Sequence, residues 1–238
     1  MEPGGAWPGS VRAAAQVFVE DLETPETGPE DGHHLARVLR LRAGETVVAA
    51  DGAGHWRACR YGPGGRLEPV GDIVSCTRPA PEVTVGFVPV KGDRPEWVVQ
   101  KLTELGVDRI VVLTSARAVV RWEGDREGKA LDRLRRVSRE GAAQSRRPWT
   151  PSVTGVGTLA DLAGELAGGL ALAQPGGPAP GPGLTGLAVG PEGGWGEAEL
   201  ELGLPAVGLG PGVLRAETAA VAAGFLLCGL RDRVIGPA

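Results

Sequence analysis

The chain has 238 residues, of which 42% are hydrophobic, and a formal net charge of −4. This balance is typical of a folded globular protein and excludes a disordered chain. The sequence also lacks an apolar run of the ~18 residues that span a membrane and the charged-then-apolar N-terminal layout of a secretory signal. We therefore expect a cytoplasmic protein that does not associate with a membrane.

The three cysteines do not predict a cross-linked or metal-binding protein. Cys59, Cys76 and Cys228 are odd in number, widely spaced and without a C-x-x-C pair. Disulfide frameworks and zinc sites need paired or closely spaced cysteines. We expect a structural role for all three and no metal site.

Charge is distributed unevenly along the second half of the chain. Residues 91–147 carry a net charge of +5, whereas residues 148–238 carry −5. A local basic patch can bind an anionic polymer even on an acidic protein, because salt screens distant charges beyond about 8 to 10 Å. The central region is therefore the candidate anion-binding surface.

The N-terminal part of the chain alternates short strands with turns. Residues 33–39 predict a helix with Leu35, Val38 and Leu39 on one face. Strands are predicted over residues 16–19, 45–50, 55–61 and 66–70. Asp-Gly and Pro-Gly-Gly turns separate the later strands, and this pattern favours a small β-barrel.

A proline-rich segment, TRPAP at 77–81, precedes a different pattern, and we place a domain boundary after residue 76. From there strands alternate with helices, which implies a parallel sheet with covering helices. The predicted strands are 83–88, 107–113, 170–173, 184–189 and 206–209, and the predicted helices are 95–105, 125–145, 159–166, one from 197, and 216–231. The helix at 125–145 is amphipathic and basic.

Two glycine-rich loops follow predicted parallel strands and lead into helices. They are GPEGG at 190–194 and LGPGVLRAETAA at 209–220. Open α/β sheets bind ligands at such positions, and glycine lets a ligand approach the main chain closely. Each loop taken alone could equally be an ordinary turn between a strand and a helix.

The chemistry of these loops disfavours a phosphate ligand. The first loop fits neither the dinucleotide fingerprint nor the P-loop. Glu192 at its centre would repel a phosphate but would attract a cationic sulfonium group. In the second loop, helix capping alone could explain Glu217 and Thr218.

Several motifs together resemble the bacterial uracil-N3 methyltransferases of small-subunit ribosomal RNA, a family of the SPOUT superfamily. They are RVLRLRAGE at 37–45, KGDR at 91–94, KLTELGV at 101–107, GPEGG at 190–194, LG at 209–210 and VLRAETA at 213–219. The resemblance covers nearly the whole chain. At one position this chain has Ala143-Gln144 where the family usually has Glu-Gln.

The resemblance implies an α/β protein of two domains. Residues 1–76 are expected to form a PUA-like β-barrel that binds RNA, and residues 77–238 a trefoil-knotted SPOUT methyltransferase domain with a parallel sheet. The implied cofactor is S-adenosyl-L-methionine. The implied partners are 16S ribosomal RNA within the small ribosomal subunit and a second copy of the chain.

The same motifs imply which residues bind the cofactor, whereas the RNA-binding residues are expected mainly from their positive charge. The implied cofactor-binding residues are Val189, Gly190, Pro191, Glu192, Gly193, Gly194, Leu209, Gly210, Val213, Leu214, Arg215, Thr218 and Ala219. The residues expected to meet RNA are Arg37, Arg40, Arg42, Lys91, Arg94, Arg117, Arg121, Gln144, Arg146 and Arg147.

The expected chemistry is methylation of N3 in a specific uridine. This atom is a poor nucleophile while it keeps its imide proton, so the enzyme must favour the imidate. That calls for N–H donors near the ring oxygens and an acceptor for the proton. We hypothesise that Arg215 or Arg94 is the donor and that Glu217 is the acceptor.

Three alternatives stay open from the sequence. The chain could be a non-catalytic RNA-binding protein with the same fold, or an unrelated α/β enzyme that binds nucleotide phosphates. It could also be a knotted methyltransferase that acts on transfer RNA or on a ribose hydroxyl. His33 and His34 lie far along the chain from the two loops, and we assign them a structural or RNA-surface role.

Overall fold

A computed structural model describes residues 6–122, 124–181 and 183–236 of the chain. The chain divides into two compact units, the first made of residues 1–78 and 139–150 and the second of residues 79–138 and 151–238. The predicted domain ranges 1–76 and 77–238 stay predictions, and their outer ends, 1–5 and 237–238, lie outside the described residues. None of the described helices is both long and apolar enough to cross a bilayer.

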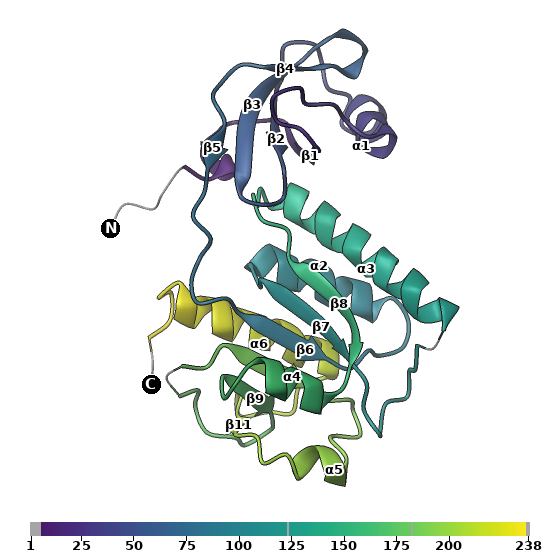
Figure 1. The fold of residues 1–238 in the computed structure, drawn as a ribbon, viewed down its shortest axis with the longest axis vertical. Coiled ribbons are helices and arrows are strands. Elements are labelled where there is room, and N and C mark those ends of the chain that lie inside the picture. Colours follow the sequence, from purple (N-terminus) through teal and green to yellow (C-terminus); the bar gives the residue numbers. More distant parts are fainter. Residues whose placement is uncertain (1–5, 123, 182, 237–238) are drawn as a thin grey trace. The chain divides into compact units, whose positions relative to one another are not determined.

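The first unit is built on a five-stranded sheet (Figure 1). Strands β1 and β2 pair in parallel, the other pairs are antiparallel, and β5 pairs with β3 beside the path β1-β2-β3-β4. The strands are β1 (Ala15–Phe18), β2 (Thr46–Ala50), β3 (His55–Tyr61), β4 (Leu67–Pro69) and β5 (Val74–Ser75). Four of the five were predicted, and the two-residue β5 was missed. Closure into a barrel stays a prediction.

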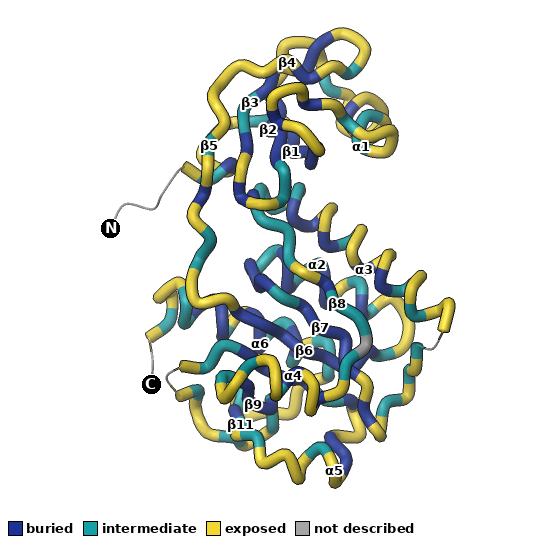
Figure 2. The backbone as a smooth tube through the Cα atoms, viewed as in Figure 1, coloured by how far each residue is buried: buried dark blue, intermediate teal, exposed yellow. Residues whose placement is uncertain are grey.

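Strands β1 and β2 are the most deeply buried part of this sheet, with all of β1 and four residues of β2 buried (Figure 2). Alternate residues of a strand point to opposite faces. Val47 and Ala49 of β2 pack in one apolar cluster with Leu35, whereas Val48 packs in a second cluster with Trp56. The all-apolar run of β2 therefore reflects burial on both sides.

The predicted helix at 33–39 is present in altered form. Helix α1 (Pro29–His33) begins earlier and continues into a π-helical turn, η2 (His34–Val38). The wider turn closes through a bond from the Leu39 N–H to the His34 carbonyl, 3.0 Å long. Leu35 is buried, but Val38 and Leu39 are 63% and 43% exposed. The prediction of one apolar face was wrong because the π turn changes the angular spacing of the side chains.

The second unit contains a six-stranded sheet that is parallel throughout, which confirms the predicted α/β fold class with a parallel sheet. The strand order is β11-β9-β10-β6-β7-β8. The strands are β6 (Thr84–Phe87), β7 (Arg109–Leu113), β8 (Ser152–Gly157), β9 (Leu170–Ala173), β10 (Gly186–Val189) and β11 (Ala206–Val207). Because β11 and β10 flank β9 and all three strands are parallel, the two glycine-rich loops begin close together, at the carboxyl ends of these strands.

Helices cover both faces of this sheet. Leu187 and Val189 of β10 point into a cluster with residues of three helices, and Ala188 between them points to the opposite cluster. Helices α2 (Arg94–Leu105), α3 (Asp125–Gln144) and α6 (Ala216–Arg231) contribute to the first cluster, and α4 (Leu159–Glu165) to the second. The remaining helix, α5 (Glu197–Leu200), is a single turn.

Local sequence signals fix the ends of several helices. Pro95 lies in the first turn of α2, where its missing N–H costs nothing, and Gly106 ends the helix with a φ of 93°. Thr158 and Asp161 form a reciprocal capping box at the start of α4. These signals explain why the helix ends were predictable.

Strand β8 was not predicted. Its sequence, SVTGVG, contains two glycines and two hydroxyl residues, and it lies at the edge of the sheet. Val153 of this strand packs in the apolar core. Pairing with β7 therefore determines this strand, and local propensity does not.

Candidate functional site

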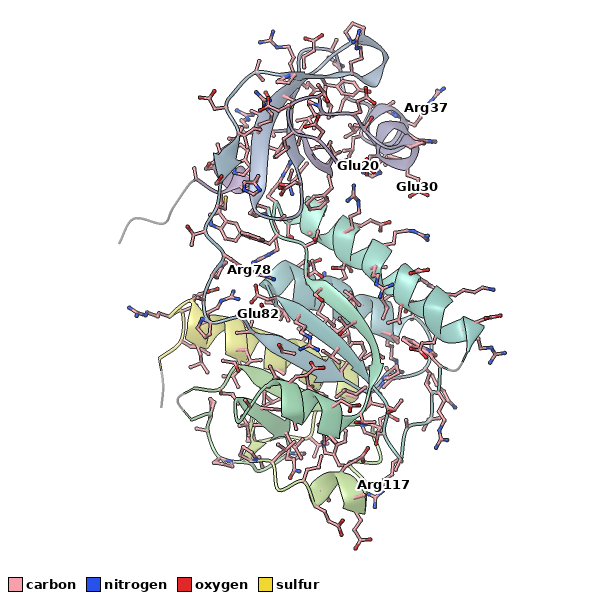
Figure 3. All side chains as sticks on the ribbon, viewed as in Figure 1. Glu20, Glu30, Arg37, Arg78, Glu82 and Arg117 are labelled. Carbon is pink, nitrogen blue, oxygen red and sulfur yellow. The ribbon has the colours of Figure 1, made fainter. Side chains whose placement is uncertain are left out.

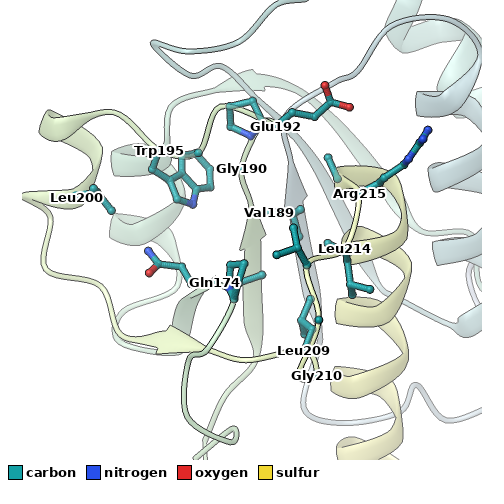
Figure 4. A pocket seen from close by; sticks show the side chains of 18 residues that line it. Gln174, Val189, Gly190, Glu192, Trp195, Leu200, Leu209, Gly210, Leu214 and Arg215 are labelled. Carbon is teal, nitrogen blue, oxygen red and sulfur yellow. The ribbon is translucent and has the colours of Figure 1, made fainter.

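A pocket of about 600 Å³ lies at the carboxyl ends of β10 and β11 (Figure 4). Strand β10 ends at Val189 and continues into Gly190, and β11 continues into the segment that contains Leu209. Both segments line the pocket. Their geometry therefore supports the expectation that the two loops form one site. The loops follow parallel strands on either side of β9, so both begin at the carboxyl end of the sheet.

Most residues of the predicted cofactor set line this pocket. They are Val189, Gly190, Pro191, Glu192, Gly194, Leu209, Gly210, Val213, Leu214, Arg215 and Ala219. Gly193 and Thr218 are not among the lining residues. The Gly193 carbonyl instead accepts a hydrogen bond of 3.0 Å from Arg117 Nη1.

Several lining residues were not predicted. They are Ala173, Gln174, Pro175, Trp195, Leu200, Gly212 and Ala216. Gln174 follows β9, which lies between β10 and β11. The strand order would have indicated this third segment, but the order of strands in a sheet is not readable from local sequence.

A neighbouring loop supports the GPEGG loop from outside the pocket. Glu199 accepts hydrogen bonds from Ser115 Oγ at 3.1 Å, from the Ala116 N–H at 3.2 Å and from the Gly196 N–H at 2.5 Å. Arg117, which lies close to α5 in Figure 3, adds the bond to the Gly193 carbonyl. One half-buried carboxylate thus holds two loops together and fixes the wall of the pocket.

Charged groups converge at the start of α6. Arg94 Nη1 lies 3.4 Å from Glu217 Oε1 and 3.8 Å from Glu192 Oε1. The side chain of Glu217 is largely buried, and its Oε2 has no hydrogen-bond partner among the described residues. Arg215 precedes α6 and lines the pocket, and its guanidinium and the Glu192 carboxylate lie on the side away from Leu209 in Figure 4. The three candidate catalytic residues therefore lie beside the pocket.

The predicted RNA-binding residues divide between the two units. Lys91, Arg117 and Arg121 of the second unit are exposed, and Arg94 is half-buried. Arg37, Arg40 and Arg42 of the first unit are also exposed, and Arg37 projects outward in Figure 3. Exposed cations of this kind can contact phosphates, and their role stays a prediction.

The remaining predicted RNA contacts lie at the end of α3 and just after it. Gln144 is exposed. Arg146 Nη2 donates to the Ala13 carbonyl at 2.8 Å, and burial lowers the pKa of its guanidinium. The Arg147 guanidinium lies 5.4 Å from the ring centroid of Trp7. These contacts give both arginines structural roles within the first unit, and their binding of RNA stays a prediction.

Comparison with known proteins places this chain in a family. Residues 78–227 match the family model described as RNA methyltransferase domain, and residues 27–65 match the model described as RNA methyltransferase PUA domain. The ribosomal RNA small subunit methyltransferase E of Mycobacterium bovis is 36% identical, with 88% of this chain and 89% of that protein covered. The protein of the same name from Bacillus subtilis is 29% identical, with 84% and 88% covered.

A solved structure agrees with the sequence comparisons. The ribosomal RNA small subunit methyltransferase E of Neisseria gonorrhoeae, bound to S-adenosyl methionine, is 27% identical, with a TM-score of 0.75. The alignment covers 91% of this chain and 97% of that structure. From the matched domains and these relatives, the chain belongs to the ribosomal RNA small subunit methyltransferase E family.

Proposed function

We propose that this protein transfers a methyl group from S-adenosylmethionine to N3 of a specific uridine in 16S ribosomal RNA. The observation that carries this proposal is the single pocket formed by both glycine-rich loops, with Arg94, Glu192 and Glu217 clustered beside it. The relatives are named as methyltransferases of small-subunit ribosomal RNA. A protein of this function would work in the cytoplasm, where ribosomal subunits are assembled.

The residues of the pocket fit the proposed cofactor. A volume of about 600 Å³ is in the range that holds a molecule of this size. The wall includes apolar Val189, Leu209 and Leu214, and Glu192 supplies a negative charge that suits a sulfonium cation. S-adenosylmethionine supplies an activated methyl group, and the two loops would hold it largely through backbone atoms.

The charged cluster suits the activation of a uracil. Arg94 and Arg215 carry N–H donors that can stabilise negative charge on the ring oxygens as N3 loses its proton. Glu217 is the acceptor that we assign to that proton, because its Oε2 is free of hydrogen bonds among the described residues. The ion pair with Arg94 holds the carboxylate in one orientation.

RNA would be bound by exposed cations on both units. Arg37, Arg40 and Arg42 would contact the ribosomal RNA from the first unit, and Lys91, Arg117 and Arg121 from the second. Contacts to phosphates position an RNA without specifying its sequence. The target base must also leave its stack or lie in a single-stranded region to reach the pocket.

We further infer that the second unit contains the trefoil knot and that the protein is a homodimer. Two hydrogen bonds between the segment after β9 and the segment around β11 support the knot: the Gly208 N–H donates to the Pro178 carbonyl, and the Gln174 N–H donates to the Val207 carbonyl, both at 2.9 Å. For the dimer, the support is an exposed apolar side chain on α6, Phe225. Light scattering should give the mass of two chains, and Phe225→Glu should shift it towards one.

The experiment that tests the function is methyl transfer with small ribosomal subunits from a strain that lacks this protein. We expect one methyl group per subunit from labelled cofactor, on N3 of one uridine when mapped by mass spectrometry. Subunits from the parent strain are the control and should accept none. Methylation of a ribose hydroxyl or of transfer RNA alone would contradict the proposal, as would the absence of transfer.

A further inference from the structure

Trp195 places a polar group at an unusual position in the wall of the pocket. The residue follows the GPEGG loop and is only 5% exposed, with its ring packed in the cluster that contains Ala188 and Leu113. Its indole Nε1 is buried and has no hydrogen-bond partner among the described residues. A buried N–H without an acceptor is costly, so such groups normally meet a partner.

The indole nitrogen lies at the edge of the pocket. Trp195 lines the pocket, and a Cβ added at Gly190 would lie 3.1 Å from Nε1. Because position 190 has no side chain, the nitrogen-bearing edge of the indole can pack against the Gly190 backbone. In Figure 4 this edge is directed towards Gln174, the neutral amide that follows β9, and away from Glu192 and Arg215.

The polar groups in this part of the pocket, Trp195 Nε1 and the Gln174 amide, suit one half of the proposed cofactor better than the other. An indole N–H only donates, whereas an amide both donates and accepts. A neutral donor beside a neutral amide suits the hydroxyl groups and ring nitrogens of a nucleoside. The ammonium and carboxylate of the amino-acid half are better matched by charged groups such as those of Glu192 and Arg215.

We propose that Trp195 Nε1 donates a hydrogen bond to the adenosine half of the bound methyl donor. Trp195 thereby becomes a residue that determines affinity for the nucleoside, and Gln174 lines the same part of the pocket. This inference rests on the proposed function, because it takes S-adenosylmethionine as the occupant of the pocket.

Calorimetry with two probes tests the inference. S-adenosylhomocysteine, the demethylated product, carries both halves of the cofactor, and 5′-methylthioadenosine carries the adenosine half without the amino-acid charges. Trp195→Phe keeps an aromatic ring and removes the donor, and benzothienylalanine at position 195 keeps the bicyclic shape as well. Trp97→Phe on the exposed side of α2 is the matched control.

We expect both changes at position 195 to lower the affinity for both probes by about fivefold to tenfold, which is the effect of losing one neutral hydrogen bond. Trp97→Phe should leave both affinities unchanged. Equal affinities in wild type and in the benzothienylalanine variant would overturn the inference, and so would a loss confined to S-adenosylhomocysteine. If wild type binds neither probe, the proposed function itself fails, which is a separate outcome.

Discussion

Arg94 and Glu217 form an ion pair beside the pocket, with 3.4 Å between Arg94 Nη1 and Glu217 Oε1. The pair joins the start of α2 to the first turn of α6, so two elements far apart in the sequence meet at the candidate catalytic centre. The second carboxylate oxygen, Oε2, is buried and has no hydrogen-bond partner among the described residues. An acceptor in this state is suited to receive a proton from a substrate.

Glu217→Gln is expected to lower kcat by at least about 100-fold, the lower end of what a general base contributes. The amide has the size of the carboxylate but cannot take the proton. Because Glu217 does not line the pocket, affinity for S-adenosylhomocysteine should change by less than about threefold, a difference below 1 kcal/mol. Single-turnover methylation and calorimetry measure the two effects separately. A variant with full turnover would remove Glu217 from the mechanism.

Arg215→Ala is expected to lower turnover by about 100-fold or more, the typical effect of removing one donor to a developing oxyanion. Arg215 lines the pocket and precedes α6, where its carbonyl still accepts the Ala219 N–H after substitution. Helix α6 should therefore stay intact, and circular dichroism checks this. Unchanged turnover on undermethylated subunits would exclude a catalytic role, even if cofactor affinity fell.

The close approach of Gly208 to Gly177 predicts a large effect of a small substitution. A Cβ at position 208 would lie 2.3 Å from the Gly177 carbonyl oxygen. Gly208→Ala should therefore destabilise the protein by about 2 kcal/mol or more, because backbone cannot move aside cheaply. Denaturant unfolding measures the change, and calorimetry should show weaker cofactor binding.

Gly164→Ala is the control for this substitution. Position 164 lies within α4, and an added Cβ meets nothing within 4 Å. Alanine there should raise the stability by about 0.5 to 1 kcal/mol through helix propensity. Equal effects of the two substitutions would contradict the steric interpretation of Gly208.

Local signals made much of the second unit predictable from sequence. Apolar runs indicated the order of strands and helices. Pro95 and Gly106 indicated where α2 begins and ends. The GPEGG and VLRAETA loops indicated the site because they follow strands and resemble known motifs. Such features act over a few residues, so they are visible before the fold is known.

The features that the sequence could not predict depend on contacts between distant segments. Strand β8 exists because β7 offers a pairing edge, and Gln174 reaches the pocket because β9 lies between β11 and β10. The π turn at His34–Val38 exposes Val38, against the expectation from helical spacing. Arg146 lies in a basic run that favours RNA binding, yet it bonds the Ala13 carbonyl.

The buried ion pair of Asp108 and Arg231 predicts that stability depends strongly on one charge. Arg231 Nη1 lies 2.7 Å from Asp108 Oδ2, and their side chains are only 2% and 6% exposed. Asp108→Asn should lower the free energy of unfolding by about 3 kcal/mol or more, because it removes the buried counter-charge of a buried guanidinium and leaves only the more exposed Asp232 beside it. Urea unfolding measures this loss.

Asp232→Asn is the matched control for that pair. Asp232 also contacts Arg231, with 2.7 Å between Arg231 Nε and Asp232 Oδ1, but its side chain is 43% exposed. Solvent screens an exposed pair, so the cost should be about 1 kcal/mol or less. A larger loss for Asp232→Asn than for Asp108→Asn would show that burial does not govern this cluster.

The exposed cations of the first unit predict how RNA affinity depends on salt. Each phosphate that a cation neutralises releases about 0.7 to 0.9 counterions, so the logarithm of the binding constant should fall linearly with the logarithm of salt concentration. Replacing Arg37, Arg40 and Arg42 by alanine should reduce this slope by up to about 3, or about 1 for each arginine that binds a phosphate. Arg66→Ala, an exposed arginine of the same unit outside the predicted RNA set, should leave the slope unchanged. Filter binding between 50 and 200 mM salt, roughly the range over which phosphate-dependent binding weakens steeply, measures both variants, and a flat dependence for wild type would contradict RNA binding by these residues.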